Sequence, residues 1–355
     1  MRPLDFGCGP HQLLLLSMRH LGDTVILAGF VNALRARDPN VNIDVLGRPG
    51  LESVLRPLCT FQEYIGIEIP FFGHHKRSIS HLNQAFQTML DIRSRHYGGC
   101  INLMGDIREN VIGWLAGTRM NVSPVWPEHH IFRNKVRAHG ASAFLNVEIC
   151  IPSSRHNFYD AMDEFATELG FTPLRWFSGP RAEVRLGGVQ TIALHPGASH
   201  HSRHWPFGKW RSLIRELRER GFRIQLLGAP SELPSLEAEF ADEISAEQVD
   251  VLVGSPDEFF SNLSEVSLLV GMDSFSVHAA YSMGIKTIIL NGPADPEIMA
   301  PPGVPTLSAG EGCRAYPCYN RPSCLGTAGE YMCVRDIEVE NVVRTVVNAM
   351  KARPE

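Results

Sequence analysis

Short apolar stretches alternate with amphipathic stretches along this chain, and this alternation limits the fold more than any other feature of the sequence. In the first half, residues 12–17, 42–47 and 98–105 predict buried strands. Residues 24–37, 79–95 and 108–117 have the spacing of helices, and Pro49-Gly50 opens a further short helix. Strands that are apolar on both faces and separated by helices predict an α/β domain with a parallel sheet.

The pattern then weakens and starts again. Residues 125–155 are rich in Pro, His and Arg and predict long loops, 157–171 predict a helix, and 179–188 resemble a linker. Strands are predicted at 191–197, 223–228, 267–271 and 287–292. Helices are predicted at 206–220, 231–241, 256–263 and 275–284, and an amphipathic helix closes the chain. We therefore expect an N-terminal domain over 1–180, a second domain over 185–335 and a C-terminal helix over 336–355.

Composition excludes several functions. A chain of 355 residues with 44% hydrophobic residues can form two cores. The formal charge of −5, without a long run of like charge, argues against nucleic-acid binding. No apolar stretch approaches the roughly 20 residues that span a bilayer, and "LLLLSM" lacks the features of a signal peptide. The sequence thus predicts a cytoplasmic protein without transmembrane segments.

Six stretches together resemble glycosyltransferase family 9, the heptosyltransferases. In chain order they are "RHLGDTVI", "HPGASHHSRHWPFGKW", "LLGAPSE", "GMDSFSVHAA", "NGPADPE" and the closing cysteine segment. The resemblance extends from about residue 13 to 345. It implies two facing Rossmann-like domains, the B-type glycosyltransferase fold, with ligands in a common cleft at the carboxyl ends of the strands. It also implies transfer of a heptose from ADP-heptose, or of a related sugar from its nucleotide, to an acceptor hydroxyl, with inversion at the anomeric carbon.

Two acids are candidates for the general base that activates the acceptor hydroxyl. Asp23 lies between the first predicted strand and helix, and the resemblance assigns it this role. Its alternative role is the N-cap of helix 24–37, which is common for Asp. Asp106 also follows a strand and precedes a helix. Arg108, Glu109 and Asn110 nearby could contact the acceptor, or they could be ordinary residues of a helical first turn.

Arg203 stands where the family carries a basic residue before the "HWP" element, and a guanidinium suits the diphosphate leaving group. Ser199 and, more weakly, Lys209 could assist, whereas a surface position is the alternative for Arg203 and Lys209. Pro206 is expected at the first helical position. Trp205 and Trp210 are expected to pack in the core, and His200, His201 and His204 are interpreted as loop residues.

The remaining donor-site candidates also follow strands. Glu232 resembles the family acid that holds the donor's ribose or adenine, although a carboxylate at a helix start needs no ligand. Asp273, Ser274 and His278 match the family pattern D-[ST]-G-x-x-H, except that Phe275 replaces Gly and puts the closest approach of a phosphate in doubt. His278 could equally be a core histidine. Asn291, Gly292 and Asp295 are expected to line the donor site, or to form a turn only.

No D-x-D motif occurs, so no catalytic metal is expected. Four cysteines, Cys313, Cys318, Cys324 and Cys333, lie within 21 residues and predict a structural zinc or iron site. Disulfides and unbonded thiols are the alternatives. Family relatives that modify autotransporter proteins carry a comparable iron-holding cysteine finger. The segment therefore raises the prospect of a protein acceptor and of a homo-oligomer.

Two other functions fit the same architecture. One is a nucleotide-sugar 2-epimerase, which needs no acceptor, and the other is a non-catalytic scaffold that binds sugar nucleotides. The replacement of Gly by Phe275 is the feature that most favours the scaffold. For a transferase, lipopolysaccharide core, a protein and a small molecule are all candidate acceptors, and residues 61–156 are expected to recognise the acceptor.

Overall fold

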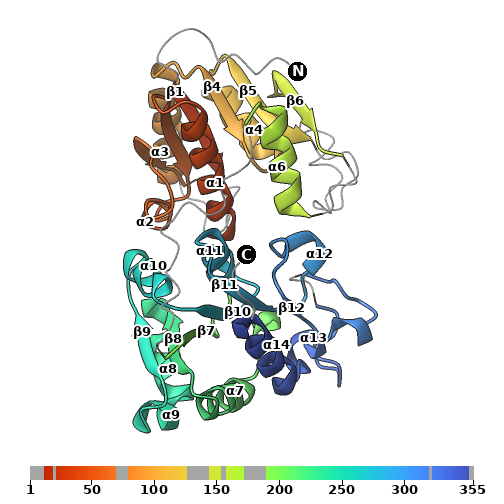
Figure 1. The fold of residues 1–355 in the computed structure, drawn as a ribbon. Coiled ribbons are helices and arrows are strands. Elements are labelled where there is room, and N and C mark those ends of the chain that lie inside the picture. The colour runs from red at the N-terminus through yellow and green to blue at the C-terminus, as the bar shows by residue number, and fades with distance from the viewer. Residues whose placement is uncertain are drawn as a thin grey trace. The chain divides into compact units, whose positions relative to one another are not determined.

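The computed structural model describes residues 12–18, 21–68, 79–125, 144–152, 157–171, 189–319 and 322–351. The chain divides into two compact units, Met1–Ser178 and Gly179–Glu355. Each unit contains one parallel sheet of six strands covered by helices (Figure 1). The predicted α/β fold class is therefore confirmed. The predicted linker at 179–188 lies outside the described residues.

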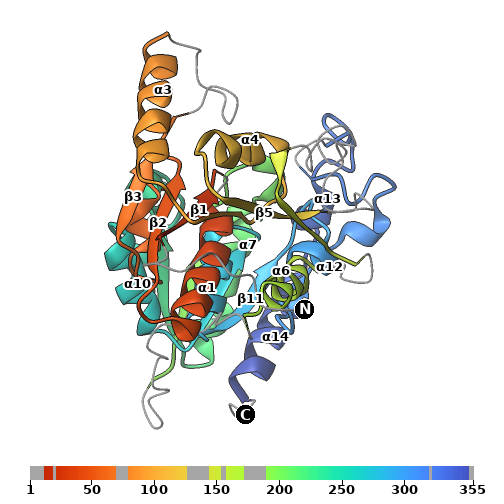
Figure 2. The same cartoon turned by 90° about the horizontal axis from the view of Figure 1, so that it is seen from above.

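The first sheet has the strand order β3-β2-β1-β4-β5-β6. Its strands are β1 (Gln12–Ser17), β2 (Asn42–Gly47), β3 (Glu63–Gly66), β4 (Gly99–Asn102), β5 (Met120–Val125) and β6 (Val147–Cys150). The helices are α1 (Leu21–Arg37), α2 (Glu52–Leu55), α3 (Ile79–Ser94), α4 (Ile107–Leu115) and α6 (Phe158–Glu168). In Figure 2, α1 and α6 lie on one face of this sheet, and α3 and α4 lie on the other.

The central strands of this sheet are buried on both faces, as expected for a sheet between two helical layers. Leu14 and Leu16 of β1 belong to a cluster with Ile92, Cys100 and Ile112, which closes the α3–α4 side. On the other side, Phe30 of α1 and Phe165 of α6 pack with their ring centroids 5.5 Å apart. Because helices cover both faces of the sheet, the middle residues of β1 and β4 are apolar.

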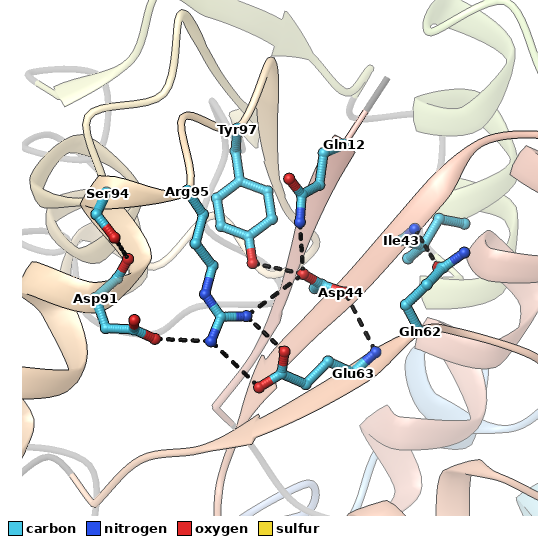
Figure 3. Close-up of polar contacts among 9 residues, drawn as sticks. All are labelled: Gln12, Ile43, Asp44, Gln62, Glu63, Asp91, Ser94, Arg95 and Tyr97. Atoms are coloured by element: carbon cyan, nitrogen blue, oxygen red, sulfur yellow. Dashed lines mark hydrogen bonds and ion pairs between the residues drawn. The ribbon is translucent and has the colours of Figure 1, made fainter. Parts of the chain in front are cut away.

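A polar cluster lies at the amino-terminal ends of the strands of the first sheet (Figure 3). Asp44 of β2 is only 2% exposed, and its carboxylate accepts hydrogen bonds from Tyr97 Oη at 2.6 Å and Gln12 Nε2 at 3.0 Å. Arg95 lies beside this carboxylate and forms ion pairs with Glu63 at 2.6 Å and Asp91 at 2.7 Å. The cluster therefore joins strands β1, β2 and β3 to the end of helix α3.

The second sheet has the order β12-β11-β10-β7-β8-β9. Its strands are β7 (Thr191–His195), β8 (Arg223–Gly228), β9 (Asp250–Val253), β10 (Leu268–Met272), β11 (Lys286–Leu290) and β12 (Thr306–Leu307). The helices are α7 (Phe207–Glu219), α8 (Leu233–Glu239), α9 (Ala241–Ser245), α10 (Pro256–Ser264), α11 (Phe275–Ser282), α12 (Pro296–Met299), α13 (Met332–Arg335) and α14 (Val339–Lys351). Short 3-10 turns occur at His201–Arg203, Pro230–Glu232 and Gly310–Gly312.

Helices α7 and α14 pack together on the core of the second unit. Trp205 and Trp210 are buried there with their ring centroids 5.1 Å apart, which confirms that both pack in the core. The apolar side of α14, with Val342, Val343 and Val346, lies in the same cluster. The C-terminal helix is thus part of the core of this unit.

Three expectations about local structure were wrong. Helix α1 begins at Leu21, so Asp23 lies within its first turn and is not its N-cap. Pro206 precedes α7 in the cap position, with φ of −56°, and Phe207 is the first helical residue. Part of the region predicted as long loops is regular, because β6 pairs in parallel with β5, with Pro124 opposite Ile149.

No helix in the described ranges is long and apolar enough to cross a membrane.

Candidate active site

Strand order brings the two predicted acids of the first unit to one sheet edge. Strands β1 and β4 are paired neighbours, with Leu16 opposite Asn102. Asp23 follows β1, in the first turn of α1, and Asp106 follows β4, at the start of α4. Both acids therefore lie at the carboxyl ends of adjacent parallel strands, where α/β sheets bind ligands.

Asp106 is deeply buried and already engaged. Its side chain is 1% exposed and caps α4 by accepting a hydrogen bond from the Arg108 backbone N–H at 2.9 Å. The Arg108 guanidinium donates to the same carboxylate from Nε at 3.0 Å and from Nη2 at 2.8 Å. This hydrogen bonding raises the pKa of Arg108, so its guanidinium is charged at neutral pH. Asp23, by contrast, is partly exposed.

The next two residues of α4 serve the interior of the first unit. Glu109 and Asn110 are both fully buried. Glu109 Oε1 accepts a hydrogen bond from the Met18 backbone N–H at 3.2 Å, and Asn110 Oδ1 accepts one from Asn102 Nδ2 at 2.5 Å. These bonds fix the start of α4 against the ends of β1 and β4, so both residues have a structural explanation.

In the second unit, Arg203 meets the residues that follow β10. Its Nη1 donates to the Asp273 carbonyl oxygen at 2.9 Å and lies 3.5 Å from Asp273 Oδ2. His278 Nε2 lies 3.9 Å from the other oxygen of this carboxylate. Arg203 Nε is buried and has no hydrogen-bond partner among the described residues. The structure thus groups Arg203, Asp273 and His278, and it leaves one guanidinium N–H unused.

The loop after β11 lies directly against the Arg203 segment. A Cβ on Gly292 would lie 2.7 Å from the Ser202 carbonyl oxygen and 3.2 Å from Arg203 Cα, so only glycine permits this approach. Asn291 is buried, and its Nδ2 donates to the Ala294 carbonyl oxygen at 2.8 Å. Asp295 caps α12 by accepting from the Glu297 backbone N–H at 3.0 Å.

Glu232 lies beside a histidine that the sequence analysis did not select. His195 ends β7, and its Nε2 is 3.7 Å from Glu232 Oε2. The same Glu232 oxygen accepts a hydrogen bond from the Ala229 backbone N–H at 2.7 Å. Burial lowers the pKa of His195, partly opposed by the charge of Glu232, so the imidazole is neutral at neutral pH. The available signal was its position, since it is the last residue of a strand that precedes a Pro-Gly turn.

Gly197 makes room for the Glu232 carboxylate. A Cβ at this position would lie within contact distance of His195 Cε1, at 3.1 Å, and would overlap Glu232 Oε1. The close packing of these three residues places one carboxylate at the carboxyl ends of the neighbouring strands β7 and β8. A carboxylate there can accept two hydroxyl donors, as a ribose would supply.

Three other predicted residues lie around or outside this group. Ser274 occupies the N-cap position of α11 without a capping hydrogen bond from its side chain, and its Oγ lies 3.2 Å from Ser276 Oγ. Ser199 is exposed in the loop after β7. Lys209 Nζ donates to the Ile337 carbonyl oxygen at 2.7 Å, which links α7 to the segment before α14. Ser274 therefore lies at the start of α11, directly after Asp273. The Lys209 ammonium is engaged by Ile337, outside the group around Arg203.

Phe275 takes part in an aromatic cluster. Its ring centroid lies 5.8 Å from that of Phe259 and 5.9 Å from that of Phe260, both on α10. Phe259 also contacts the His195 ring edge to face, at 6.0 Å. The replacement of the family glycine by Phe thus adds apolar contacts between α10 and α11.

The four clustered cysteines do not form a metal-ligand set in this structure. Among the described residues, no three His, Cys, Asp or Glu side chains are arranged to hold a metal ion, and no disulfide joins the four. Burial and the neighbouring thiols of Cys318, Cys324 and Cys313 raise the pKa of Cys333 to about 11. The segment is not simply a loop, since Cys333 lies in α13 and is buried.

These features suit sugar transfer from an activated donor. An arginine with an unused N–H, next to a helix start, can bind an anionic leaving group, and a carboxylate at a strand end can activate a hydroxyl. Solved structures of heptosyltransferases are similar to this chain in fold. The structure of heptosyltransferase WaaC from Escherichia coli with ADP matches with a TM-score of 0.71 at 17% identity, covering 95% of this chain and 99% of that one.

A second solved structure and one curated relative extend the comparison. The iron-containing dodecameric glycosyltransferase TibC from enterotoxigenic Escherichia coli matches with a TM-score of 0.54 at 12% identity, covering 96% of this chain and 76% of that one. Lipopolysaccharide heptosyltransferase 3 of Escherichia coli is 21% identical over 295 residues, which are 78% of this chain and 82% of that protein. Likeness at this identity supports the fold.

The sequence profile of one family matches residues 91–327, which is more than half of the chain. The fold and this match define the protein as a glycosyltransferase with two Rossmann-like units. The chain belongs to glycosyltransferase family 9 (heptosyltransferase). The resemblance found in the sequence motifs is therefore confirmed.

Proposed function

We propose that this protein transfers a heptose from ADP-heptose to an acceptor hydroxyl, with inversion at the anomeric carbon. The observation that carries the proposal is the Arg203 side chain, which Asp273 orients while its buried Nε–H lacks a partner among the described residues. A diphosphate oxygen is the partner that this donor would take as the glycosidic bond breaks. Membership of the heptosyltransferase family supports heptose as the sugar.

The other residues take roles that follow from their surroundings. His278 and the start of α11, with Ser274, contribute donors to the diphosphate, and Glu232 accepts from the ribose hydroxyls. Asn291, Gly292 and Asp295 complete this donor site, with Ser199 in the neighbouring loop. Asp23, a partly exposed residue, takes the proton of the acceptor hydroxyl. The three hydrogen bonds from Arg108 that hold the Asp106 carboxylate support this choice.

Lipopolysaccharide core is the acceptor that we propose to test first, because the curated relative is a lipopolysaccharide heptosyltransferase. The protein is incubated with ADP-heptose and a core oligosaccharide. We expect ADP release that depends on the acceptor, together with a product one heptose heavier and of inverted anomeric configuration by NMR. Protein and small-molecule acceptors form parallel arms. Absence of transfer to all three acceptor classes would contradict the proposal.

The same assay decides between the other functions. A reaction without acceptor that changes the stereochemistry of the donor sugar would identify an epimerase. Donor binding without any turnover would identify a scaffold. Arg203→Met should lose transfer. Arg203 does not belong to the hydrophobic core around α7, so this variant should stay folded.

We also propose that the cysteine segment binds one structural iron or zinc ion. Its support is the clustering of the four cysteines within 21 residues of the sequence and the likeness to a glycosyltransferase described as iron-containing. Binding of the ion would have to draw the thiols together, since no three such ligands are arranged around one point among the described residues. Metal analysis of the purified protein should find about one such ion per chain, bound by cysteines that can form a tetrahedral site. A metal-free, fully active protein would refute this part, and no catalytic step depends on it.

Two further expectations are proposals of the same kind. We propose that the protein works in the cytoplasm and that it forms a homo-oligomer, and the second is supported by the dodecameric state named for TibC. Light scattering after gel filtration measures the assembly, and fractionation of cells measures the location. A monomer at working concentration or a periplasmic location would overturn the respective proposal.

A further inference from the structure

The cysteine segment is attached to the proposed donor site through one side chain. Tyr316 lies between Cys313 and Cys318 and is half-buried. Its hydroxyl donates to the Ala294 carbonyl oxygen at 2.9 Å and accepts from Asn291 Nδ2 at 2.9 Å. A second link runs from the Tyr319 backbone N–H to the Pro293 carbonyl oxygen at 2.9 Å. The loop after β11 is therefore held from outside by the cysteine segment.

Packing leaves the Tyr316 ring little freedom. A Cβ on Gly310 would lie 2.5 Å from two carbon atoms of the ring, so the ring rests directly on the glycine backbone. Gly310 is itself anchored, because its backbone N–H donates to Ser308 Oγ at 3.1 Å. Packing therefore holds the Tyr316 ring in the position from which its hydroxyl bonds to the loop after β11.

The loop that Tyr316 holds also supports Arg203. Gly292, next to the hydrogen-bonded Asn291, touches the backbone of Ser202 and Arg203. Arg203 in turn donates to the Asp273 carbonyl oxygen. A continuous series of contacts therefore runs from Tyr316 through Asn291 and Gly292 to the guanidinium that is proposed to meet the diphosphate.

We propose that Tyr316 is a positioning residue for donor binding, which fixes the Asn291–Asp295 loop and through it the place of Arg203. This inference rests on the proposed function, because it assigns the loop to the donor site. Tyr316 does not touch the reacting atoms. Its loss should weaken donor binding while the chemical step, once the donor is bound, is preserved.

The test compares Tyr316→Phe with Tyr331→Phe. Tyr331 lies in the same segment and bonds to Cys324 through its backbone N–H, and among the described residues its hydroxyl has no hydrogen-bond partner. For Tyr316→Phe we expect the KM for ADP-heptose and the Kd for ADP to rise about three- to tenfold, as for loss of a neutral hydrogen bond. The kcat should change less than twofold. Hydrogen exchange of peptides covering 291–295 should accelerate, and Tyr331→Phe should match the wild type in each measurement.

Gly310→Ala provides a second variant, because its methyl group displaces the same ring while every hydroxyl remains. It should raise the same KM by at least as much as Tyr316→Phe. Failure of the proposed function shows in the wild type, as absence of ADP binding or of transfer. Failure of the present inference shows as wild-type KM and Kd in Tyr316→Phe, or as an equal effect of Tyr331→Phe, in an enzyme that is otherwise active.

Discussion

Asp23 and Asp106 occupy equivalent positions after two adjacent strands, but their surroundings differ. The Asp106 carboxylate accepts three hydrogen bonds from Arg108 and is almost wholly buried. A general base must reach the acceptor proton and must be able to take it. Protonation of Asp106 would break an ion pair inside the first unit, which costs several kcal/mol in comparable buried pairs. At the scale of single residues, the engagement of Asp106 supports the proposal that Asp23 is the base.

The replacement of each acid by its amide tests this choice. Asp23→Asn should lower kcat by about 100- to 10,000-fold, the usual contribution of a general base, while the Kd for ADP stays unchanged. Asp106→Asn should lower the free energy of unfolding, because Arg108 loses its ion pair. In the folded variant it should keep transfer within about tenfold, since Asn caps a helix nearly as well as Asp. Steady-state kinetics with ADP titration checks both variants. The assignment fails if Asp106→Asn is the inactive variant.

His195 makes stability depend on pH in a defined direction. Burial lowers the pKa of His195 in the folded protein below its ordinary value of 6.5. As pH falls through 6.5, the unfolded chain takes up a proton that the folded protein refuses, so the native state loses stability. His195→Gln should therefore flatten the decline in the free energy of unfolding between pH 7 and pH 5. One proton accounts for at most about 1.4 kcal/mol per pH unit.

Urea unfolding at pH 7, 6 and 5 measures this difference, with the exposed His201→Gln as control. The other titrating groups cancel when each variant is compared with the wild type. Parallel pH profiles of wild type and His195→Gln would show that the buried imidazole does not control stability in this range.

Sequence motifs located most candidate residues but not the side chains that hold them. The order of the motifs predicted that Arg203, Asp273 and Gly292 would belong together, and the structure brings them into contact. His195 and Tyr316 were missed because their roles depend on partners 37 and 25 or 22 residues away, at Glu232 and at Asn291 and Ala294. Nothing in the local sequence reveals such partners.

Among the elements, most inner strands were predicted, whereas the edge strands β3, β6, β9 and β12 were missed. Strands β1, β7 and β10 contain continuous apolar runs and were predicted correctly. Strand β6 was missed because "VEIC" alternates charged and apolar residues at the edge of the sheet. In β5, "MNVSPV", Pro124 and two polar residues conceal a strand. The Asn121 Nδ2 group in β5 donates to the carbonyl oxygens of Asn110 at 2.9 Å and Phe144 at 2.8 Å, which satisfies its donors inside the fold.

The polar cluster at the amino-terminal edge of the first sheet should contribute to stability and not to catalysis. Tyr97→Phe removes the 2.6 Å hydrogen bond to Asp44, whose carboxylate stays buried (Figure 3). The cost should be about 1–3 kcal/mol in the free energy of unfolding, with unchanged kcat. Chemical denaturation measures it. The control Glu52→Gln, in an exposed i,i+4 pair with Arg56, should cost less than about 0.5 kcal/mol.

Lys209 belongs to the contact between α7 and α14. Its ammonium and Trp205 Nε1 both donate to the Ile337 carbonyl oxygen, at 2.7 Å and 3.1 Å. Lys209→Met should therefore lower stability by about 1 kcal/mol and leave the KM for ADP-heptose unchanged. Arg203→Met should raise that KM strongly. If Lys209→Met raises the KM for ADP-heptose as much as Arg203→Met does, Lys209 belongs to the donor site and the prediction is wrong.

At the scale of the whole molecule, chemistry is divided between two units with separate cores. The proposed base comes from the unit Met1–Ser178, and every residue proposed to bind the donor comes from Gly179–Glu355. Within the second unit, the donor residues follow β7, β8, β10 and β11, which are joined in one sheet. Donor binding should thus be a property of the second sheet, while transfer needs both units.

This division predicts where ADP protects the protein. With ADP at about 100 times its Kd, the bound state gains about 2.7 kcal/mol, so amide exchange should slow in peptides covering 195–203, 228–232, 273–278 and 291–295. Hydrogen exchange with mass spectrometry measures each peptide separately. Asp23→Asn should show the same protection as the wild type, because Asp23 acts on the acceptor, and Arg203→Met should show little. Protection confined to 21–37 and 99–115 would mean that the nucleotide binds to the first sheet, and would overturn the assignment of donor and acceptor to the two units.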